Sequence, residues 1–384
     1  MNQQAQFTMV ESGDSNPAER VRSLLPTLSA RAAALDEDDG FVGDNYPLLR
    51  QAGLIEAGVP RELGGSGANL RELADMLRLL AHGCSATALA FSMHTHQVAI
   101  PAWRWRHQKA MAVEPLLRRI AAERIVLLSS GGSDWIAGSG EARKVEGGYR
   151  VRARKVFTSG AAAGDLLMTG ALLRGEDGDQ VIHFALPMKA PEVRVLDNWR
   201  TLGMRATGSN DVQIDDCFVP DTAVSFTRKA GEWHPVFQVI ATLAFPLIYA
   251  VYVGVAERAR EIAVGLARSR PPREDLLSLA GRMDTALRGA QYALEGMLRE
   301  TERNAPSAES VNEVMIGRSL VARQAIETVE LAMELAGGAG FYRSQGLERL
   351  FRDIQAARYH PLQPGPQARY AGATALGLPV SNIF

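Results

Sequence analysis

The spacing of apolar residues changes twice along the chain. In the first third, apolar residues recur at intervals of three and four, which is typical of helices that bury one face. In the middle third they alternate with polar residues in short runs that Gly, Asp and Pro interrupt, which is typical of strands. In the last third, long helical periods return. The pattern therefore predicts helices, then a sheet, then longer helices.

The individual elements follow from these periods. In the first third we expect helices over residues 17–35, 46–52, 69–81 and 86–103. In the middle third we expect strands over residues 125–129, 149–157, 165–173, 181–187, 193–197 and 211–219. Gly147 and Gly148 supply a tight turn before the second of these strands. Long helices over 235–269, 275–303 and 310–335 suit an antiparallel bundle.

These elements predict an α+β fold with three domains. We expect an N-terminal helical domain over residues 20–124, a central antiparallel β-barrel or sandwich domain over 125–230, and a C-terminal four-helix bundle over 231–384. Residues 1–19 are polar and have neither the basic nor the apolar region of a secretory signal. We expect them to form a mobile tail.

One apolar stretch is long enough to cross a bilayer. Residues 236–256 form an uncharged run of 21 residues. Gln238 and Pro246 fall inside the run, and charged residues resume at once with Glu257 and Arg258. The helical period also continues without a loop, so we expect a helix that is buried on all sides inside the bundle.

Composition excludes several classes of partner. The net charge of the 384 residues is −1, so no overall field favours nucleic acid or an acidic membrane surface. Cys84 and Cys217 are far apart in the sequence and do not make a disulfide framework, which favours a reducing cytoplasm. We expect no metal site, no nucleic-acid partner and no membrane association.

Three strings in the expected order resemble signatures of the acyl-CoA dehydrogenase superfamily. The first is FVGDNYPLLRQAGLIEAGVPRELGGSGANL, residues 41–70. The second is NWRTLGMRATGSNDVQIDDCFVP, residues 198–220, and the third joins ELAGGAGF to LERLFRD within residues 334–353. The resemblance extends over nearly the whole chain from about residue 20. It implies a flavoprotein with helical, β and helical domains.

The resemblance also implies where the flavin binds. Residues 129–134 stand where the family has a T-E-P-x-x-G-S-D loop, although the Thr-Glu-Pro part is not recognisable. Phe157 stands where the family has an aromatic wall beside the ring, and Thr158 or Ser159 supplies a hydroxyl near N5. A plain β-core role for Phe157 stays open. The glycine turn at Gly337 corresponds to one that approaches the pyrophosphate from a neighbouring subunit, which implies a homotetramer or homodimer.

The predicted cofactor-binding residues are Ser130, Ser133, Phe157, Thr158, Ser159, Arg268, Arg270, Gly337, Gly338, Gly340, Arg352 and Asp353. Arg268 or Arg270 would take the place of the family's pyrophosphate-binding Arg, but the Phe-Gly that follows it there is absent. FAD is therefore the first expectation, and FMN from a separate reductase stays open. An ordinary ion pair on a helix surface is the other reading of Arg352 and Asp353.

The usual catalytic base is missing. Most of the family carries a Glu eight residues after the Asp that corresponds to Asp353, and here that position is Pro361. A minority places the Glu on the first bundle helix, whose apolar run here is uncharged. His360 stands beside the empty position and resembles a His of flavin monooxygenases with this fold. Histidine suits proton transfer near neutral pH.

The predicted catalytic residues are therefore His360 and Ser159, with His94 or His96 as companions in the pocket or as structural residues. We favour oxygen-using, monooxygenase-type chemistry at the flavin C4a. An acyl-CoA or acyl-carrier dehydrogenase with an atypical base and a non-catalytic flavin-binding partner remain alternatives. The expected substrate is a small molecule or an acyl thioester, and the expected redox partner is a flavin reductase or an electron-transfer flavoprotein.

Overall fold

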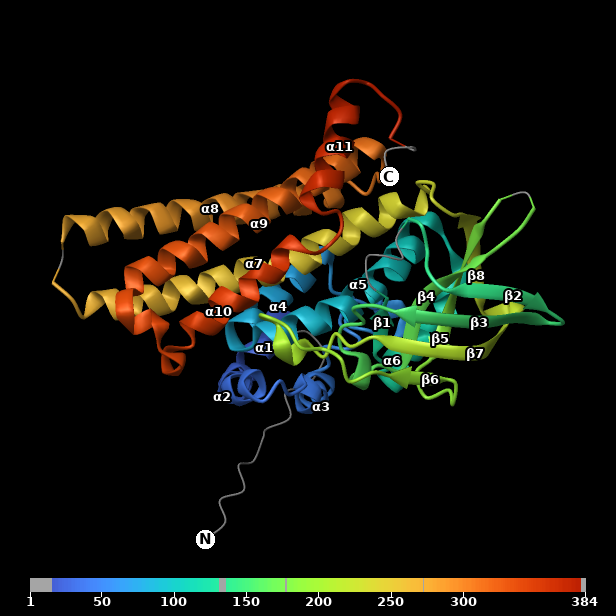
Figure 1. Ribbon diagram of the computed structural model, residues 1–384, viewed down its shortest axis with the longest axis horizontal. Coiled ribbons are helices and arrows are strands. Elements are labelled where there is room, and N and C mark those ends of the chain that lie inside the picture. The colour runs from blue at the N-terminus through green and yellow to red at the C-terminus, as the bar shows by residue number, and fades with distance from the viewer. Residues whose placement is uncertain (1–15, 131–135, 177, 272, 381–384) are drawn as a thin grey trace, which may run out of the picture.

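The computed structural model describes residues 16–130, 136–176, 178–271 and 273–380. Figure 1 shows the long C-terminal helices running side by side on one side of the molecule and a sheet on the other. Helices α4 (Leu70–Gly83) and α5 (Ser85–Gln108) lie between them and contact the first long helix, α7 (Val236–Arg268). The order of helices, sheet and helices is the order that the sequence predicts.

The N-terminal helices begin and end where local chemistry favours it. Asn69 caps α4 in a capping box with Glu72, which satisfies two backbone donors at the start of the helix. α5 is buried along most of its length, so it forms the centre of the molecule and not a surface. The remaining helices of this part are α1 (Pro17–Arg22), α2 (Leu25–Glu37), α3 (Asn45–Gln51) and α6 (Glu114–Glu123).

The central sheet is mixed and does not close into a barrel. Its strands follow the order β6-β7-β3-β2-β4-β5-β8, and β1 pairs with β4 off this path. β4 runs parallel to both β1 and β2. In both cases the chain between the two paired strands is longer than a hairpin turn, as parallel pairing requires. The expected antiparallel barrel or sandwich is thus an open sheet. The strands are β1 (Leu127–Ser129), β2 (Glu141–Val145), β3 (Gly148–Lys155), β4 (Leu166–Leu173), β5 (Gln180–Pro187), β6 (Val193–Val195), β7 (Val212–Pro220) and β8 (Val224–Lys229).

The C-terminal part is built on α7, α8 (Glu274–Glu302) and α9 (Ala308–Ala336). The shorter α10 (Leu347–Ile354) packs against α7 and α9, and α11 (Pro364–Ala375) packs against α9. The predicted four-helix bundle thus has three long helices among the described residues. The short helices α10 and α11, together with α4, pack where a fourth long helix would lie. This arrangement brings the residues after α10 against the buried face of α7.

The apolar run at the start of α7 lies inside the protein. α7 is long and apolar enough to cross a membrane, and 94% of its most apolar window is buried. Buried residues surround it because α4, α5, α8, α9 and α10 all pack on it. This is the position of a core helix in a soluble protein.

Candidate functional site

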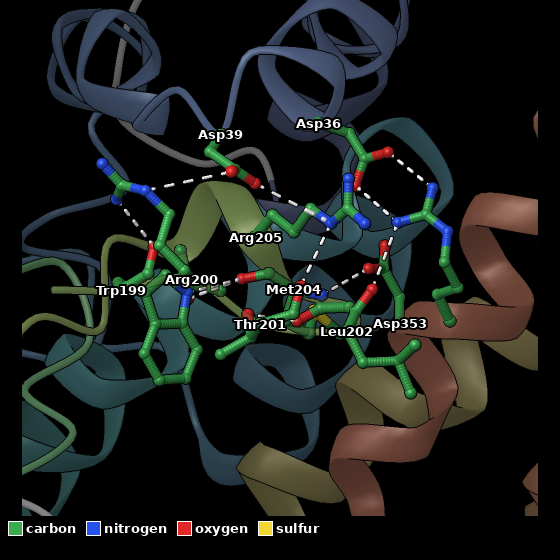
Figure 2. A network of polar contacts seen from close by, with 12 residues as sticks. Asp36, Asp39, Trp199, Arg200, Thr201, Leu202, Met204, Arg205 and Asp353 are labelled. Carbon is green, nitrogen blue, oxygen red and sulfur yellow. Dashed lines mark hydrogen bonds and ion pairs between the residues drawn. The ribbon is translucent and has the colours of Figure 1, made fainter.

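A loop between β6 and β7 joins the three parts of the chain (Figure 2). The backbone N–H of Met204 donates to Oδ1 of Asp353 at 2.5 Å, and the hydroxyl of Ser85 donates to the other carboxylate oxygen. Asp353 belongs to α10 and is 2% exposed. Burial raises the pKa of this carboxyl above its ordinary value. Asp353 thus ties α10 to the loop and to the start of α5.

Arg352, also on α10, connects this helix to the N-terminal helices. Its guanidinium pairs with Asp36 at 2.6 Å and with Glu348 at 2.8 Å, and it also donates to the carbonyl of Leu202. The Arg352 side chain is 16% exposed, so this is a partly buried cluster and not a helix-surface pair. Both residues of the predicted Arg-Asp pair are therefore engaged by the chain's own groups.

The loop approaches α10 too closely for a side chain at Gly203. A Cβ there would lie 2.2 Å from the carbonyl oxygen of Arg352. The next residue, Met204, has φ +54°, a left-handed conformation that costs a non-glycine residue free energy. Contact with Asp353 holds this strained residue in place. The Leu-Gly-Met-Arg string therefore has a structural reason for its glycine.

Phe157 follows the end of β3 and does not lie in the core of the sheet. Its φ is +61° and its side chain is 56% exposed. The ring meets the indole of Trp199 edge to face, with 5.6 Å between ring centroids, and the indole N–H donates to the carbonyl of Met204. An exposed aromatic ring on a strained backbone is typical of a binding surface. The β-core reading of Phe157 is thus wrong.

The hydroxyls that follow Phe157 have defined roles. Thr207 donates its one proton to the carbonyl of Met204, so Ser209 donates to Thr207 at 2.7 Å. Ser159 in turn donates to Ser209 at 2.8 Å, which leaves the lone pairs of Ser159 as acceptors. The hydroxyl of Thr158 is buried and has no hydrogen-bond partner among the described residues. A ligand that reaches this hydroxyl would satisfy it.

The other predicted β-domain residues are less informative. Ser130 accepts a hydrogen bond from the hydroxyl of Thr169 at 3.0 Å. Ser133 lies outside the described residues, as does most of the loop over 129–134.

The glycine turn after α9 is open to solvent. Gly337 has φ +62° and ψ −151°, a conformation that essentially only glycine adopts. Gly337 and Gly338 are exposed, whereas Gly340 is buried. Arg270 reaches this turn and donates to the carbonyl of Leu335. Arg268, in contrast, is exposed at the end of α7.

His360 is held from two long helices. Its Nε2 lies 2.6 Å from the hydroxyl of Tyr252 on α7. Its backbone carbonyl accepts a hydrogen bond of 2.7 Å from Arg318 on α9. Burial, followed by the nearby charge of Arg318 and by His96, lowers the pKa of His360 to about 3. His360 is therefore neutral at neutral pH.

His94 and His96 are buried on α5. Nδ1 of His94 accepts from the N–H of Leu127, so its Nε2 carries the proton and donates to the carbonyl of Ile55 at 2.9 Å. This pairing makes His94 a structural residue. Nδ1 of His96 bonds the carbonyl of Ser92, and burial lowers the pKa of both rings to about 4.

The carboxylates around α7 are already engaged. Glu257, the first acid after the apolar run, accepts hydrogen bonds from Arg78, His82 and Gln291. Within the described ranges, the ring of His360 has no carboxylate partner, and no hydrogen bond links it to Ser159. The structure therefore does not bring the two predicted catalytic side chains into direct contact.

Two hollows lie away from these groups. One of about 190 Å³ opens between α4, α5, α7 and the end of α8, lined by Leu73, Trp103 and Leu243 among others. The second, about 360 Å³, lies at the start of α7 beside Phe226 and His234. Neither is lined by a predicted site residue.

Two features of the β domain are compatible with a flavin: the Phe157 ring is exposed, and the buried Thr158 hydroxyl lacks a partner among the described residues. The Gly337 turn is exposed and has a backbone conformation that favours glycine, which is compatible with close approach to a ligand. Sequence reasoning missed Tyr252 and Arg318, which contact His360. Each is a polar side chain among the buried residues of a long helix, and this feature of the sequence could have identified them.

Comparison with known proteins assigns a family to the three parts of the chain. Residues 18–119, 129–217 and 247–363 match the N-terminal, middle and C-terminal domains of acyl-CoA dehydrogenase. L-evernosamine nitrososynthase of Micromonospora sp. is 28% identical over 94% of this chain and 90% of its own length. The oxygenase component of p-hydroxyphenylacetate 3-hydroxylase of Acinetobacter baumannii is 24% identical over 89% of this chain and 84% of its own.

A solved structure is similar over the whole chain. KijD3 in complex with FMN and dTDP-3-amino-2,3,6-trideoxy-4-keto-3-methyl-D-glucose has a TM-score of 0.86 and 29% identity, and the match covers 96% of each chain. The three domain matches follow one another in the order of the helical, sheet and helical parts described above. The chain belongs to the acyl-CoA dehydrogenase superfamily of flavin-dependent oxidoreductases.

Proposed function

We propose that this protein is the oxygenase of a flavin-dependent monooxygenase system. The observation that carries the proposal is the neutral His360 beside Pro361, where most of the family has its Glu base. Removal of an α-proton needs a positioned general base, which in most of the family is that Glu. Glu257 and Asp353, the acids nearest in sequence to the two usual base positions, are held by the chain's own donors.

The flavin would be held by the β domain of one subunit and by the glycine turn of its neighbour. Phe157 would cover one face of the ring, and the Thr158 hydroxyl would gain the partner it lacks. The Gly337 turn and Arg270 would approach the phosphate. The bound flavin supplies the two electrons with which oxygen is activated. FMN and FAD both suit the described residues.

The chain's own residues would control protons and water near the reacting centre. Because His360 stays neutral, it can hydrogen-bond to a group near the flavin without adding a positive charge. Ser159 points its proton toward Ser209, so it offers an acceptor to any N–H that approaches. The apolar face of α7 beside His360 excludes water, which limits side reactions of activated oxygen.

The relatives suggest a class of substrate. The nitrososynthase and KijD3 matches both concern amino sugars, the second as a dTDP derivative. We infer that an amine-bearing nucleotide sugar is the first substrate class to test. The name of the hydroxylase oxygenase component supports a separate reductase as the source of reduced flavin. We also propose a cytoplasmic homotetramer or homodimer, because Phe341 beside the Gly337 turn is 82% exposed.

An oxygenase and an acyl-CoA dehydrogenase predict opposite results in two measurements on the flavin-loaded chain. In one arm, the oxidised flavin-loaded chain is mixed anaerobically with a panel of acyl-CoA thioesters, and we expect no bleaching of the flavin. In the other arm, the reduced chain is mixed with oxygen, and we expect a transient absorbance that differs from both reduced and oxidised flavin. Bleaching by any thioester without a transient in the second arm would overturn the proposal. Flavin binding without either signal would favour a non-catalytic partner.

A further inference from the structure

The ring of His360 meets a set of buried polar groups on three helices. Tyr252 and Tyr249 face it from α7, with ring centroids 5.6 Å and 6.3 Å away. Arg318 on α9 and His96 on α5 are the further titratable groups whose charge acts on it. Asp353 on α10 acts on Tyr252. The partly buried imidazole therefore lies among polar groups of several helices and not at a loose helix end.

The hydrogen bond from Tyr252 determines which nitrogen of His360 carries the proton. Tyr252 is fully buried, and its hydroxyl has His360 as its hydrogen-bond partner within the described part of the chain. A hydroxyl proton that pointed elsewhere would be buried without an acceptor. Burial also keeps the pKa of the phenol well above its ordinary value, so the proton stays on Tyr252. Tyr252 therefore donates, and Nε2 of His360 accepts.

The consequence is a single tautomer. A neutral imidazole that accepts at Nε2 carries its proton at Nδ1. Among the described residues, Nδ1 of His360 has no hydrogen-bond partner, so this N–H is the donor that the ring can offer to another molecule. A second proton is disfavoured because the Arg318 guanidinium is 1% exposed and has no carboxylate partner in the described ranges.

Arg318 also fixes the segment that carries the ring. Its Nη2 donates to the carbonyls of His360 and of Ala357, at 2.7 Å and 3.3 Å. The guanidinium stacks on the ring of Tyr249, whose hydroxyl donates to the same Ala357 carbonyl. The backbone before Pro361 is thus held by α7 and α9 together.

We propose that Tyr252 is a positioning residue that locks His360 as the neutral tautomer with its proton on Nδ1, so that His360 serves the site as a hydrogen-bond donor. The inference rests on the proposed oxygenase function for its catalytic meaning. The tautomer itself is a property of the chain and does not depend on turnover. Arg318 supports the same state by holding the backbone and by opposing a second charge.

The chain offers a matched pair of variants. Tyr252→Phe removes the hydroxyl that contacts Nε2. Tyr249→Phe removes an equally buried hydroxyl one turn away that contacts a backbone carbonyl instead. The chain has 7 histidines, so the signals of His360 in a ¹⁵N-histidine-labelled sample can be assigned by comparison with His360→Gln. The first readout is the protonation of Nδ1 and Nε2 by NMR, on the chain without substrate.

We expect the wild-type chain and Tyr249→Phe to show a protonated Nδ1 and an unprotonated Nε2. In Tyr252→Phe the ratio of the two tautomers should shift by about fivefold or more toward Nε2–H, as the loss of one ordinary hydrogen bond implies. A wild-type spectrum with the proton on Nε2, or an unchanged ratio in Tyr252→Phe, would overturn the inference. The wild-type spectrum decides this even if the variant does not fold.

The second readout is the ratio of oxygenated product to free hydrogen peroxide during turnover with reduced flavin. We expect it to fall about tenfold in Tyr252→Phe and by less than about threefold in Tyr249→Phe, which keeps the hydroxyl that contacts Nε2. A shifted tautomer with an unchanged ratio would reduce Tyr252 to a structural residue and overturn the positioning role. If no product forms in the wild-type chain, the proposed function fails while the tautomer result stands.

Discussion

Replacing Asp353 by Ala tests whether the loop between β6 and β7 is held by this carboxylate. The substitution leaves the Met204 N–H and the Ser85 hydroxyl buried without acceptors. Each buried, unpaired donor costs about 1–3 kcal/mol. The unfavourable burial of the carboxylate, seen in its raised pKa, offsets part of this. We therefore expect a loss of about 2–4 kcal/mol in the free energy of unfolding.

The assay is urea unfolding of the flavin-free chain, followed by titration with flavin. Asp353→Asn is the matched control, because its amide still accepts from Met204 and donates to Ser85, and we expect it to lose less than about 1.5 kcal/mol. Flavin affinity should fall in Asp353→Ala, since the loop carries the hydroxyls that orient Ser159. Unfolding within about 1 kcal/mol of wild type would refute the reasoning.

Three further changes test separate parts of the site. Thr158→Val removes a hydroxyl that has no partner, so the flavin-free chain should lose no stability while flavin binding weakens about fivefold; unchanged affinity would contradict the assignment. Gly337→Ala should destabilise the chain by about 1–3 kcal/mol in urea, whereas Gly338→Ala, with nothing within 4 Å of its Cβ, should cost less than about 0.5 kcal/mol. Burial lowers the pKa of His94 from 6.5 to about 4, so between these values the unfolded chain binds a proton that the folded chain does not. The free energy of unfolding should therefore be highest above pH 6.5 and should fall as the pH falls toward 4. His94→Gln should reduce the slope of unfolding free energy against pH in that window by up to about 1.4 kcal/mol per unit, and an unchanged slope would contradict the buried neutral ring.

Elements with strong periods could be predicted from the sequence, and elements with weak ones could not. The strand over 165–173 and the three long helices lie within a few residues of their expected positions. The sequence did not predict β2, which has five residues. Ala142 is its one buried residue, so apolar and polar positions hardly alternate along it. The parallel pairing of β4 was missed as well, because strand direction depends on connections and not on local pattern.

The site was predictable only where one local string carries it. Phe157 and Gly337 stand in such strings, and both are exposed and have a positive φ. Thr158, next to Phe157, is buried and its hydroxyl has no partner among the described residues. The contact between Tyr252 and His360 joins residues 108 positions apart, and nothing in the segment around Tyr252 marks it as the partner of His360. Only the packing of α7 against the segment after α10 brings them together.

The most direct test of the account follows the oxygen atoms. The chain, loaded with reduced flavin by an added reductase, is mixed with ¹⁸O₂ and an amine-bearing nucleotide sugar, and the product is analysed by mass spectrometry. The account predicts a product that contains ¹⁸O from the gas, with less product and more free hydrogen peroxide in His360→Gln. Desaturation of an acyl thioester under nitrogen, with no ¹⁸O in any product, would contradict it.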